Sequence, residues 1–209
     1  NGCLVGSEMC IRDRVIIGAG STNFGLGIVG DFFKSKILSG STLVLHDINP
    51  ETLKNTYEIA LSYKEKLGVN FNIESTTSRS DALKKADFCL ISIEVGNRFE
   101  LWEQDWKVPL QYGIKQVYGE NGGAGGLFHA MRQVPAIIKI CEDIEKICPE
   151  AFVFSYSNPM QRICHALNTR FPNLRITGLC HEIASMTRQL PTLMAVSYTH
   201  LRAHETSVD

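Results

Sequence analysis

The sequence lacks several features that would point to a membrane or a nucleic-acid partner. Its 209 residues contain no apolar run long enough to span a bilayer, and the formal net charge is only -1. A balanced charge gives no attraction to a polyanion or to an anionic membrane surface. Internal repeats and low-complexity tracts are also missing. We therefore expect one α/β domain with its own core, and neither a membrane nor a nucleic-acid partner.

Both ends of the chain lack the periodicity of a helix or a strand. They read CLVGSEMCIRDR (residues 3–14) and VSYTHLRAHET (residues 196–206), which match translations of the two complementary strands of one sequencing-adapter oligonucleotide. Two such peptides are not expected by chance. We therefore expect residues 1–14 and 196–209 to be adapter-derived, residues 15–195 to be native, and the natural gene to continue past Ala195.

Cysteine usage indicates a reducing compartment. Of seven cysteines, Cys3 and Cys10 fall in the first adapter segment, which leaves five. An odd number, with no signal peptide and no closely spaced framework, does not indicate a disulfide scaffold. We therefore expect a cytoplasmic protein with reduced thiols.

The strongest local motif is VIIGAGSTNF, residues 15–24. An apolar run turns on Gly18 and Gly20, followed by Ser21, into the start of a helix. Glycines let the backbone approach a pyrophosphate, and a helix N-terminus offers free N–H groups. A full dinucleotide fingerprint would place its third glycine at position 23, which is Asn23. A glycine turn in an ordinary α/β protein is therefore the alternative.

A second apolar run ends in Asp47. A ribose-binding carboxylate is expected ~20 residues after the glycines, and Asp47 lies slightly farther along the chain than that. An Asp at a strand end can also cap the next helix. Because Asn49-Pro50-Glu51 already has the pattern of a helix start, Asp47 is free for the ribose. The motif thus predicts a dinucleotide site at Gly18, Gly20, Ser21 and Asp47, and the family resemblance given below implies that the dinucleotide is NAD.

Strand and helix signals alternate along the chain. After the first apolar run, strands are expected at residues 42–47, 71–75, 88–93, 152–156 and 174–179, and helices at residues 25–37, 51–67, 80–86 and 127–147. This alternation predicts an α/β fold, a Rossmann-like doubly wound parallel sheet with helices on both faces.

Residues 94–126 show no clear period and are expected to be irregular. They are rich in charged and aromatic side chains and end in GENGGAGG, residues 119–126. Ordering such a segment costs entropy, and long segments of this kind often carry function. The aromatic content favours a packed active-site segment over a mobile surface lid. No role is assigned to His129 and Arg132, which could equally be surface residues.

Polar residues follow two of the expected strands. Asn158 lies where ligands bind in doubly wound folds, with an N-cap of the next helix as an equal alternative. Cys180 and His181 follow the last strand and could be metal ligands or acid–base groups. The alternatives are a small buried hydrophobe for Cys180 and a surface or capping residue for His181.

Taken together, five motifs resemble glycoside hydrolase family 4. They are GAGS (18–21), LHDIN (45–49), GENGGAGG (119–126), YSNPM (156–160) and GLCHEI (178–183). The family contains NAD- and Mn²⁺-dependent α-glucosidases, α-galactosidases, α-galacturonidases and 6-phospho-glycosidases. The resemblance covers residues 15–186 and implies NAD and Mn²⁺ as cofactors and a small carbohydrate as the substrate.

The resemblance implies hydrolysis by a redox route rather than by the paired carboxylates of most glycosidases. Hydride passes from the sugar C3 to NAD⁺, a base removes the C2 proton, and the aglycone is eliminated. Water then adds, and the NADH reduces the ketone. The implied metal acts as a Lewis acid at O2 and O3. Family members commonly form dimers or tetramers, so a homo-oligomer is expected at full length.

Carried over by position, the resemblance assigns a role to each matching residue. Cys180 is the implied metal ligand, and His181 is the implied general acid. Glu120 corresponds to an acidic residue that raises the basicity of a catalytic tyrosine. Asn158 and Asp105 are expected to lie against the substrate.

Two departures from the family pattern matter. Trp102 stands where 6-phospho-glycosidases carry a phosphate-contacting Arg, which favours an unphosphorylated α-glycoside on whose face the indole stacks. The family's metal-binding His and its base are expected beyond Ala195, in a missing C-terminal domain. We therefore expect the 209-residue chain to be inactive and poorly soluble.

Two other classes of function are compatible with a glycine turn. A lactate/malate-type dehydrogenase would share the turn, the ribose acid and the Asn-Pro pair, but it gives no reason for Cys180 and His181. A non-catalytic NAD-binding module would keep the fold without the chemistry.

Overall fold

The computed structural model describes residues 13–21, 25–116, 119–180 and 182–194. The chain divides into two compact units, Asn1–Gly178 and Leu179–Asp209. The first unit contains the sheet, and the second contains helix α7 (Glu182–Met194). Among the helices in the described part of the chain, none has the length and apolar character needed to cross a membrane.

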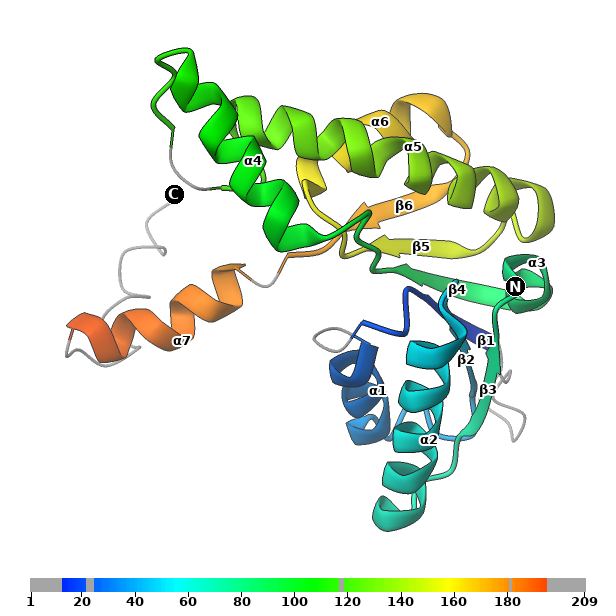
Figure 1. Ribbon diagram of the computed structural model, residues 1–209. Coiled ribbons are helices and arrows are strands. Elements are labelled where there is room, and N and C mark those ends of the chain that lie inside the picture. The colour runs from blue at the N-terminus through cyan, green and yellow to red at the C-terminus, as the bar shows by residue number, and fades with distance from the viewer. Residues whose placement is uncertain (1–12, 22–24, 117–118, 181, 195–209) are drawn as a thin grey trace, which may run out of the picture. The chain divides into compact units, whose positions relative to one another are not determined.

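The first unit is built on a six-stranded sheet in the order β3-β2-β1-β4-β5-β6 (Figure 1). Every pair of neighbouring strands is parallel. The strands are β1 (Asp13–Ile17), β2 (Thr42–His46), β3 (Asn72–Thr76), β4 (Ala86–Ile91), β5 (Phe152–Ser155) and β6 (Arg175–Gly178). The order in which strands are added reverses between β1 and β4: β2 and β3 extend the sheet on one side of β1, and β4, β5 and β6 extend it on the other. Ligands bind beyond the carboxyl ends of the strands at such a switch point.

Alternate residues of each strand build two cores, one on each face of the sheet. In β1, Val15 and Ile17 join one core, while Ile16 between them joins the other. The first core packs under α3, α5 and α6, and the second under α1 and α2. The helices are α1 (Gly25–Lys34), α2 (Pro50–Leu67), α3 (Arg79–Leu83), α4 (Arg98–Gln111), α5 (Gly123–Ile147) and α6 (Met160–Arg170). The predicted Rossmann-like, doubly wound parallel sheet with helices on both faces is confirmed.

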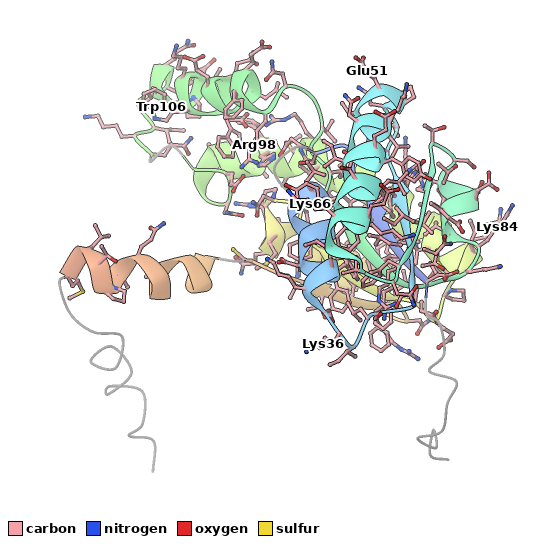
Figure 2. All side chains as sticks on the ribbon, turned by 90° about the horizontal axis from the view of Figure 1, so that it is seen from below. Lys36, Glu51, Lys66, Lys84, Arg98 and Trp106 are labelled. Atoms are coloured by element: carbon pink, nitrogen blue, oxygen red, sulfur yellow. The ribbon has the colours of Figure 1, made fainter. Side chains whose placement is uncertain are left out.

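Helix α2 illustrates how the local sequence sets the helix ends. The Asn49 side chain accepts hydrogen bonds from the backbone N–H groups of Glu51 and Thr52, and Gly68 ends the helix with φ 62°. Glu51 near the beginning and Lys66 near the end match the helix dipole (Figure 2). Asn49 therefore caps this helix, and the nearby acid at the end of β2, Asp47, does not.

Strand β1 begins two residues earlier than expected. Asp13 and Arg14, which the adapter interpretation treats as non-native, pair with Ala86 and Phe88 of β4. Ladder hydrogen bonds are made by the main chain, so a strand can extend into a segment of any origin. The origin of residues 1–14 and 196–209 stays a prediction.

The expectation of irregular structure over residues 94–126 was wrong, because most of this segment is helical. Helix α4 includes Pro109, which has no N–H to donate to the carbonyl of Asp105 one turn earlier. The side chain of Gln116 donates to that carbonyl instead, at 3.0 Å. A residue outside the helix thus satisfies it, which periodicity within the segment does not reveal.

Helix α5 begins at Gly123, inside the glycine-rich stretch and not at Leu127 as expected. The N–H of Gly126 donates to the carbonyl of Gly122 at 2.9 Å. A Cβ on Gly125 would lie 3.2 Å from the carbonyl oxygen of Asp105 in α4. The glycines therefore form the first turn of a helix that lies very close to its neighbour.

Candidate functional site

A cavity of about 80 Å³ lies at the switch point of the sheet. Its wall contains Ser21 after β1, residues 92–94 after β4, residues 156–158 after β5, and Arg98 at the start of α4. The carboxyl ends of these parallel strands lie at one edge, so segments far apart in sequence meet there. Ser21 and Asn158, both predicted site residues, are thus brought to one cavity.

The turn after β1 leaves no room for a side chain at either of its glycines. Gly18 has φ 92°, and a Cβ there would collide with the backbone of Ser92, whose carbonyl carbon would be 2.8 Å away. A Cβ on Gly20 would lie 2.8 Å from Oδ2 of Asp47. The N–H of Gly18 also donates to the carbonyl of His46 at 2.9 Å. The turn is therefore pressed between the ends of β2 and β4.

Gly25 supplies the close packing that the fingerprint assigns to its third glycine. It is the first residue of α1, and a Cβ there would lie 2.9 Å from the carbonyl carbon of Ala19 and collide with its oxygen. Asn23, at the expected position of the third glycine, lies outside the described residues. The signal for Gly25 was present in the sequence, displaced by two positions from the usual spacing.

Asp47 lies beside this turn at the end of β2. Its Oδ2 accepts the N–H of Gly20 at 2.8 Å, and its Oδ1 accepts the N–H of Asn49 at 2.9 Å. Each carboxylate oxygen can accept a further hydrogen bond. A turn whose glycines have no room for a Cβ, a helix start and an oriented carboxylate together fit a dinucleotide.

Glu120 and Asn158, predicted from separate motifs, are in direct contact. Asn158 Nδ2 donates to Glu120 Oε1 at 2.7 Å, and Arg98 Nη2 donates to Glu120 Oε2 at 2.9 Å. The Glu120 side chain is 18% exposed, so this ion pair is largely shielded from water. The alternative role of Asn158 as a helix cap is not what the structure shows, because Pro159 is the N-cap of α6.

His129 is fully buried, and both of its ring nitrogens are used. Nδ1 lies 3.2 Å from the backbone oxygen of Glu120, and Nε2 lies 2.9 Å from Oε1 of Glu94. Gln133 Nε2 donates to the same Glu94 oxygen. Sequence reasoning assigned no role to these residues. The available signal was the spacing of His129 and Gln133, one turn apart on the face of α5 that is otherwise apolar.

Asp105 is buried, contacts Arg132 of α5, and is not one of the residues that line the cavity. Arg132 holds it in a two-pronged ion pair, with Nη1–Oδ1 at 2.9 Å and Nη2–Oδ2 at 2.5 Å. Hydrogen bonding to Asp105 raises the pKa of the Arg132 guanidinium. The placement of Asp105 against a substrate stays a prediction, and Arg132 is a buried ion-pair partner that the sequence did not reveal.

Trp102 is enclosed by other site residues. The Arg98 guanidinium lies over its ring at 4.2 Å from the centroid, and the ring meets His129 edge-on at 6.4 Å. A sugar stacked on Trp102 would therefore need the face opposite Arg98.

The last two predicted site residues follow β6. Cys180 is exposed and belongs to the second unit, so it is not the buried hydrophobe of the alternative interpretation. His181 lies outside the described residues. Over residues 13–21, 25–116, 119–180 and 182–194, no group of three or more His, Cys, Asp or Glu is arranged to hold a metal ion. These residues by themselves do not fit a complete metal centre.

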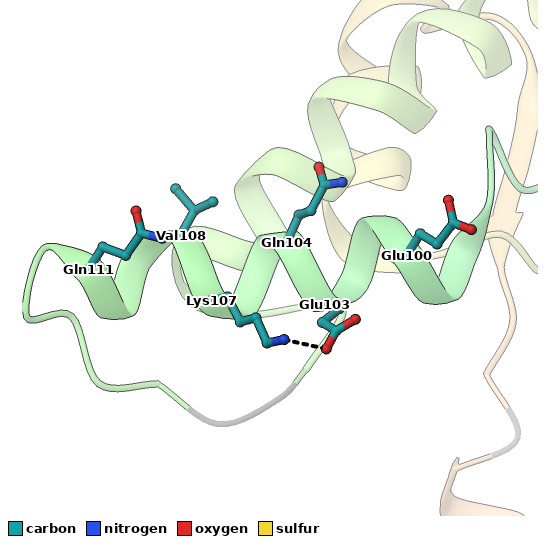
Figure 3. Close-up of a pocket in the computed structure, with 6 residues that line it drawn as sticks. All are labelled: Glu100, Glu103, Gln104, Lys107, Val108 and Gln111. Atoms are coloured by element: carbon teal, nitrogen blue, oxygen red, sulfur yellow. Dashed lines mark ion pairs between the residues drawn. The ribbon is translucent and has the colours of Figure 1, made fainter.

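A larger hollow of about 500 Å³ runs along the outer side of α4 (Figure 3). Its polar wall includes Glu103 and Lys107, which form an ion pair at 2.6 Å with side chains more than half exposed. Exposed pairs of this kind contribute little. None of the predicted site residues lines this hollow, so it gives no reason to place chemistry there.

Comparison with known proteins identifies the family whose members this chain resembles. The family model described as "Family 4 glycosyl hydrolase" matches residues 14–196. An α-glucosidase of Erwinia rhapontici is 52% identical over 187 residues, which are 90% of this chain and 41% of the relative. An α-galactosidase of Bacillus subtilis (strain 168) is 32% identical over 180 residues, 86% of this chain and 41% of the relative. The chain thus spans 41% of the length of each of these relatives.

Solved structures resemble the chain over a similar range. A 6-phospho-α-glucosidase from gut microorganisms, in complex with NAD and Mn²⁺, has a TM-score of 0.76 at 25% identity. That match covers 90% of this chain and 42% of the other. A malate dehydrogenase from Plasmodium falciparum has a TM-score of 0.63 at 22% identity, covering 90% and 52%, and this shows a common fold alone.

Proposed function

Because the chain belongs to family 4 of the glycosyl hydrolases, we propose that the protein is an NAD- and Mn²⁺-dependent glycosidase acting on an unphosphorylated α-glycoside. The similarity to an α-glucosidase and an α-galactosidase supports the class of substrate. The 6-phospho-α-glucosidase in complex with NAD and Mn²⁺ supports the cofactors. One observation carries the proposal: a close-packed glycine turn and the Glu120–Asn158 pair lie at the same edge of the sheet.

The glycine turn is the proposed cofactor site. The backbone of the turn at Gly18, Gly20 and Ser21 would lie close against the pyrophosphate, because the glycines carry no side chain there, and Asp47 would accept hydrogen bonds from the ribose. Bound NAD supplies the hydride acceptor for the sugar. Asp47 is oriented for this role because Gly20 and Asn49 already hold its two oxygens.

Asn158 and Glu120 form the proposed substrate side of the site. Since Asn158 Nδ2 donates to Glu120, the amide oxygen of Asn158 is the atom that can accept a hydrogen bond from a sugar hydroxyl. Arg98 lies within ion-pair distance of Glu120 and balances its charge in a largely buried position. We further propose that Asp105 acts through Arg132, fastening α4 to α5 so that Arg98 and Trp102 keep their places.

Cys180 is the proposed first ligand of the manganese ion, and His181 the proposed general acid. A thiolate is a competent ligand, and Cys180 is exposed to a metal in solution. The described residues do not complete the coordination shell.

The dehydrogenase alternative is supported by the common fold alone. Nothing among the described residues favours it over the glycosidase. A non-catalytic NAD-binding module would keep the glycine turn but would have no use for the Arg98–Glu120–Asn158 contacts.

The test is to recover the full-length gene from the source DNA and assay its product on p-nitrophenyl α-glucoside, α-galactoside and α-galacturonide. Turnover is expected to require NAD⁺, Mn²⁺ and a thiol reductant, and to be lost in Cys180→Ser. Cys164→Ala, in α6, is the matched control and should retain turnover. The 209-residue chain alone is expected to give none. A folded, NAD-binding product that cleaves neither these substrates nor phosphorylated glycosides would contradict the proposal.

A further inference from the structure

Glu94 is a carboxylate at the cavity wall that none of the sequence motifs singled out. It follows β4, lines the cavity with Ser21 and Asn158, and has a side chain that is 27% exposed. Its Oε1 is held by two donors from α5, His129 Nε2 at 2.9 Å and Gln133 Nε2. Glu94 is thus fixed by buried groups on one side and open to the cavity on the other.

The two oxygens of Glu94 differ in what they contact. Both α5 donors reach Oε1, and among the residues that the structure describes no donor reaches Oε2. A carboxylate accepts about four hydrogen bonds in all, so Oε2 keeps its full accepting capacity. An acceptor that is held in place without being satisfied suits a ligand that donates hydrogen bonds.

The hydrogens that the contacts of His129 require indicate which class of ligand fits beside Glu94. Nδ1 faces the backbone oxygen of Glu120, which can only accept, so Nδ1 carries a hydrogen. The contact between Nε2 and Glu94 Oε1 needs one further proton, on the ring or on the carboxyl group. The Glu94–His129 pair is therefore neutral as a whole. A neutral donor such as a hydroxyl fits beside it better than an ammonium or a phosphate.

We propose that Glu94 Oε2 accepts a hydrogen bond from a sugar-ring hydroxyl in this cavity, and that His129 and Gln133 are positioning residues that hold Glu94. The inference rests on the proposed function, which brings two sugar rings to this edge of the sheet. One is a ribose of the cofactor, and the other is the ring of the glycoside. Both offer the same chemistry, a hydroxyl that donates.

Glu94→Gln tests the acceptor directly. The amide oxygen can stay with the two α5 donors, which puts an N–H₂ group where Oε2 was, a donor in place of an acceptor. A lost hydrogen bond to such an acceptor corresponds to roughly a 10-fold weakening, and to about 100-fold where the proton lies on His129 and the carboxylate is charged. If the hydroxyl is that of a ribose, the Kd for NAD⁺ should rise by this factor. If it belongs to the glycoside, kcat/KM should fall while the Kd for NAD⁺ is unchanged.

His129→Asn tests the positioning role. Its amide N–H can replace Nδ1 toward Glu120, but nothing replaces Nε2 toward Glu94. We expect it to shift the same parameter as Glu94→Gln, by a smaller factor. Glu58→Gln, on the surface of α2 with a side chain 61% exposed, is the matched control and should change neither.

Unfolding temperature, followed by circular dichroism, separates binding from folding. If Glu94→Gln does not fold, Glu94→Asp keeps the charge while withdrawing it by one methylene, and the same shifts are expected. Folded Glu94 variants with wild-type Kd for NAD⁺ and wild-type kcat/KM would overturn the inference. A full-length wild type that cleaves no glycoside overturns the proposed function instead. NAD⁺ binding then decides the inference alone, and an unchanged Kd overturns it.

Discussion

Two regions beside the cavity are built in opposite ways. The glycine wall, which is the turn after β1 together with Gly25, admits no side chain at its glycines, since a Cβ on Gly18 or Gly25 would collide with neighbouring backbone. The polar wall, residues 94, 98, 120, 129 and 158, consists of side chains that hold one another, with Glu120 between Arg98 and Asn158.

The two walls differ in how far they can be predicted from the sequence. The glycine wall is encoded within a few consecutive residues, because a tight turn constrains its own backbone. The polar wall comes from residues 94, 98, 120, 129 and 158, which only the sheet and two helices bring together. The first wall should therefore tolerate no added atoms, whereas the second should be damaged by any loss of charge balance.

The largest effect is expected from adding one methyl group to the glycine wall. Gly18→Ala combines a strained positive φ with a collision at Ser92, and Gly25→Ala collides with Ala19. Together, left-handed strain and overpacking predict a loss of about 2–5 kcal/mol in the free energy of unfolding. Urea unfolding followed by circular dichroism measures it.

Gly27→Ala is the matched control for this pair. Gly27 lies in α1 with nothing within 4 Å of an added Cβ, so alanine should stabilise the helix by about 0.5–1 kcal/mol. Equal stabilities for Gly25→Ala and Gly27→Ala would show that the close approach at Ala19 does not constrain the turn.

A smaller effect is expected from breaking the ion pair behind the polar wall. Asp105→Asn leaves the Arg132 guanidinium without its counter-charge, at a cost of up to about 3 kcal/mol in unfolding free energy. The value stays below that of a fully buried pair, because the Arg132 side chain is 24% exposed. Urea titration measures this loss of unfolding free energy.

The double variant Asp105→Asn with Arg132→Met removes both charges and isolates their coupling. We expect it to be more stable than Asp105→Asn, because no unpaired guanidinium is left at the α4–α5 contact. Additive losses in the double-mutant cycle would mean that the two side chains do not act as a pair.

The smallest effect concerns pH and the strand that supports the glycine wall. His46 is buried, its Nδ1 lies 3.0 Å from the carbonyl of Thr76, and burial lowers its pKa below the ordinary 6.5. At mildly acidic pH the unfolded chain therefore binds more protons than the folded one. This contribution to stability is present above pH 6.5 and is lost as the pH falls below it.

His46→Asn can keep a donor to Thr76 but does not titrate, so its stability should vary less between pH 5 and pH 7 than that of the wild type. Thermal unfolding at several pH values measures the difference. His165→Asn, an exposed position on α6, is the control and should keep the wild-type pH dependence. Identical pH profiles of stability for His46→Asn and the wild type would show that His46 does not contribute to the pH dependence.

The sequence by itself determined the alternating α/β pattern, the glycine turn, the acid at the end of β2 and the family, each of which the structure or the comparisons confirm. These features are local, or they are sums of local motifs, so windows of a few residues contain them. The pairing of Glu120 with Asn158 was also within reach, because both come from motifs that a parallel sheet carries to one edge.

Only the tertiary structure decided the rest. Helix α4 persists past Pro109 because Gln116 satisfies the carbonyl that proline leaves open. His129 became a fully buried site residue because α5 packs against the segment that carries Glu94. A side chain's role in such cases depends on partners tens of residues away. Packing selects those partners, and the local pattern of the sequence does not record them.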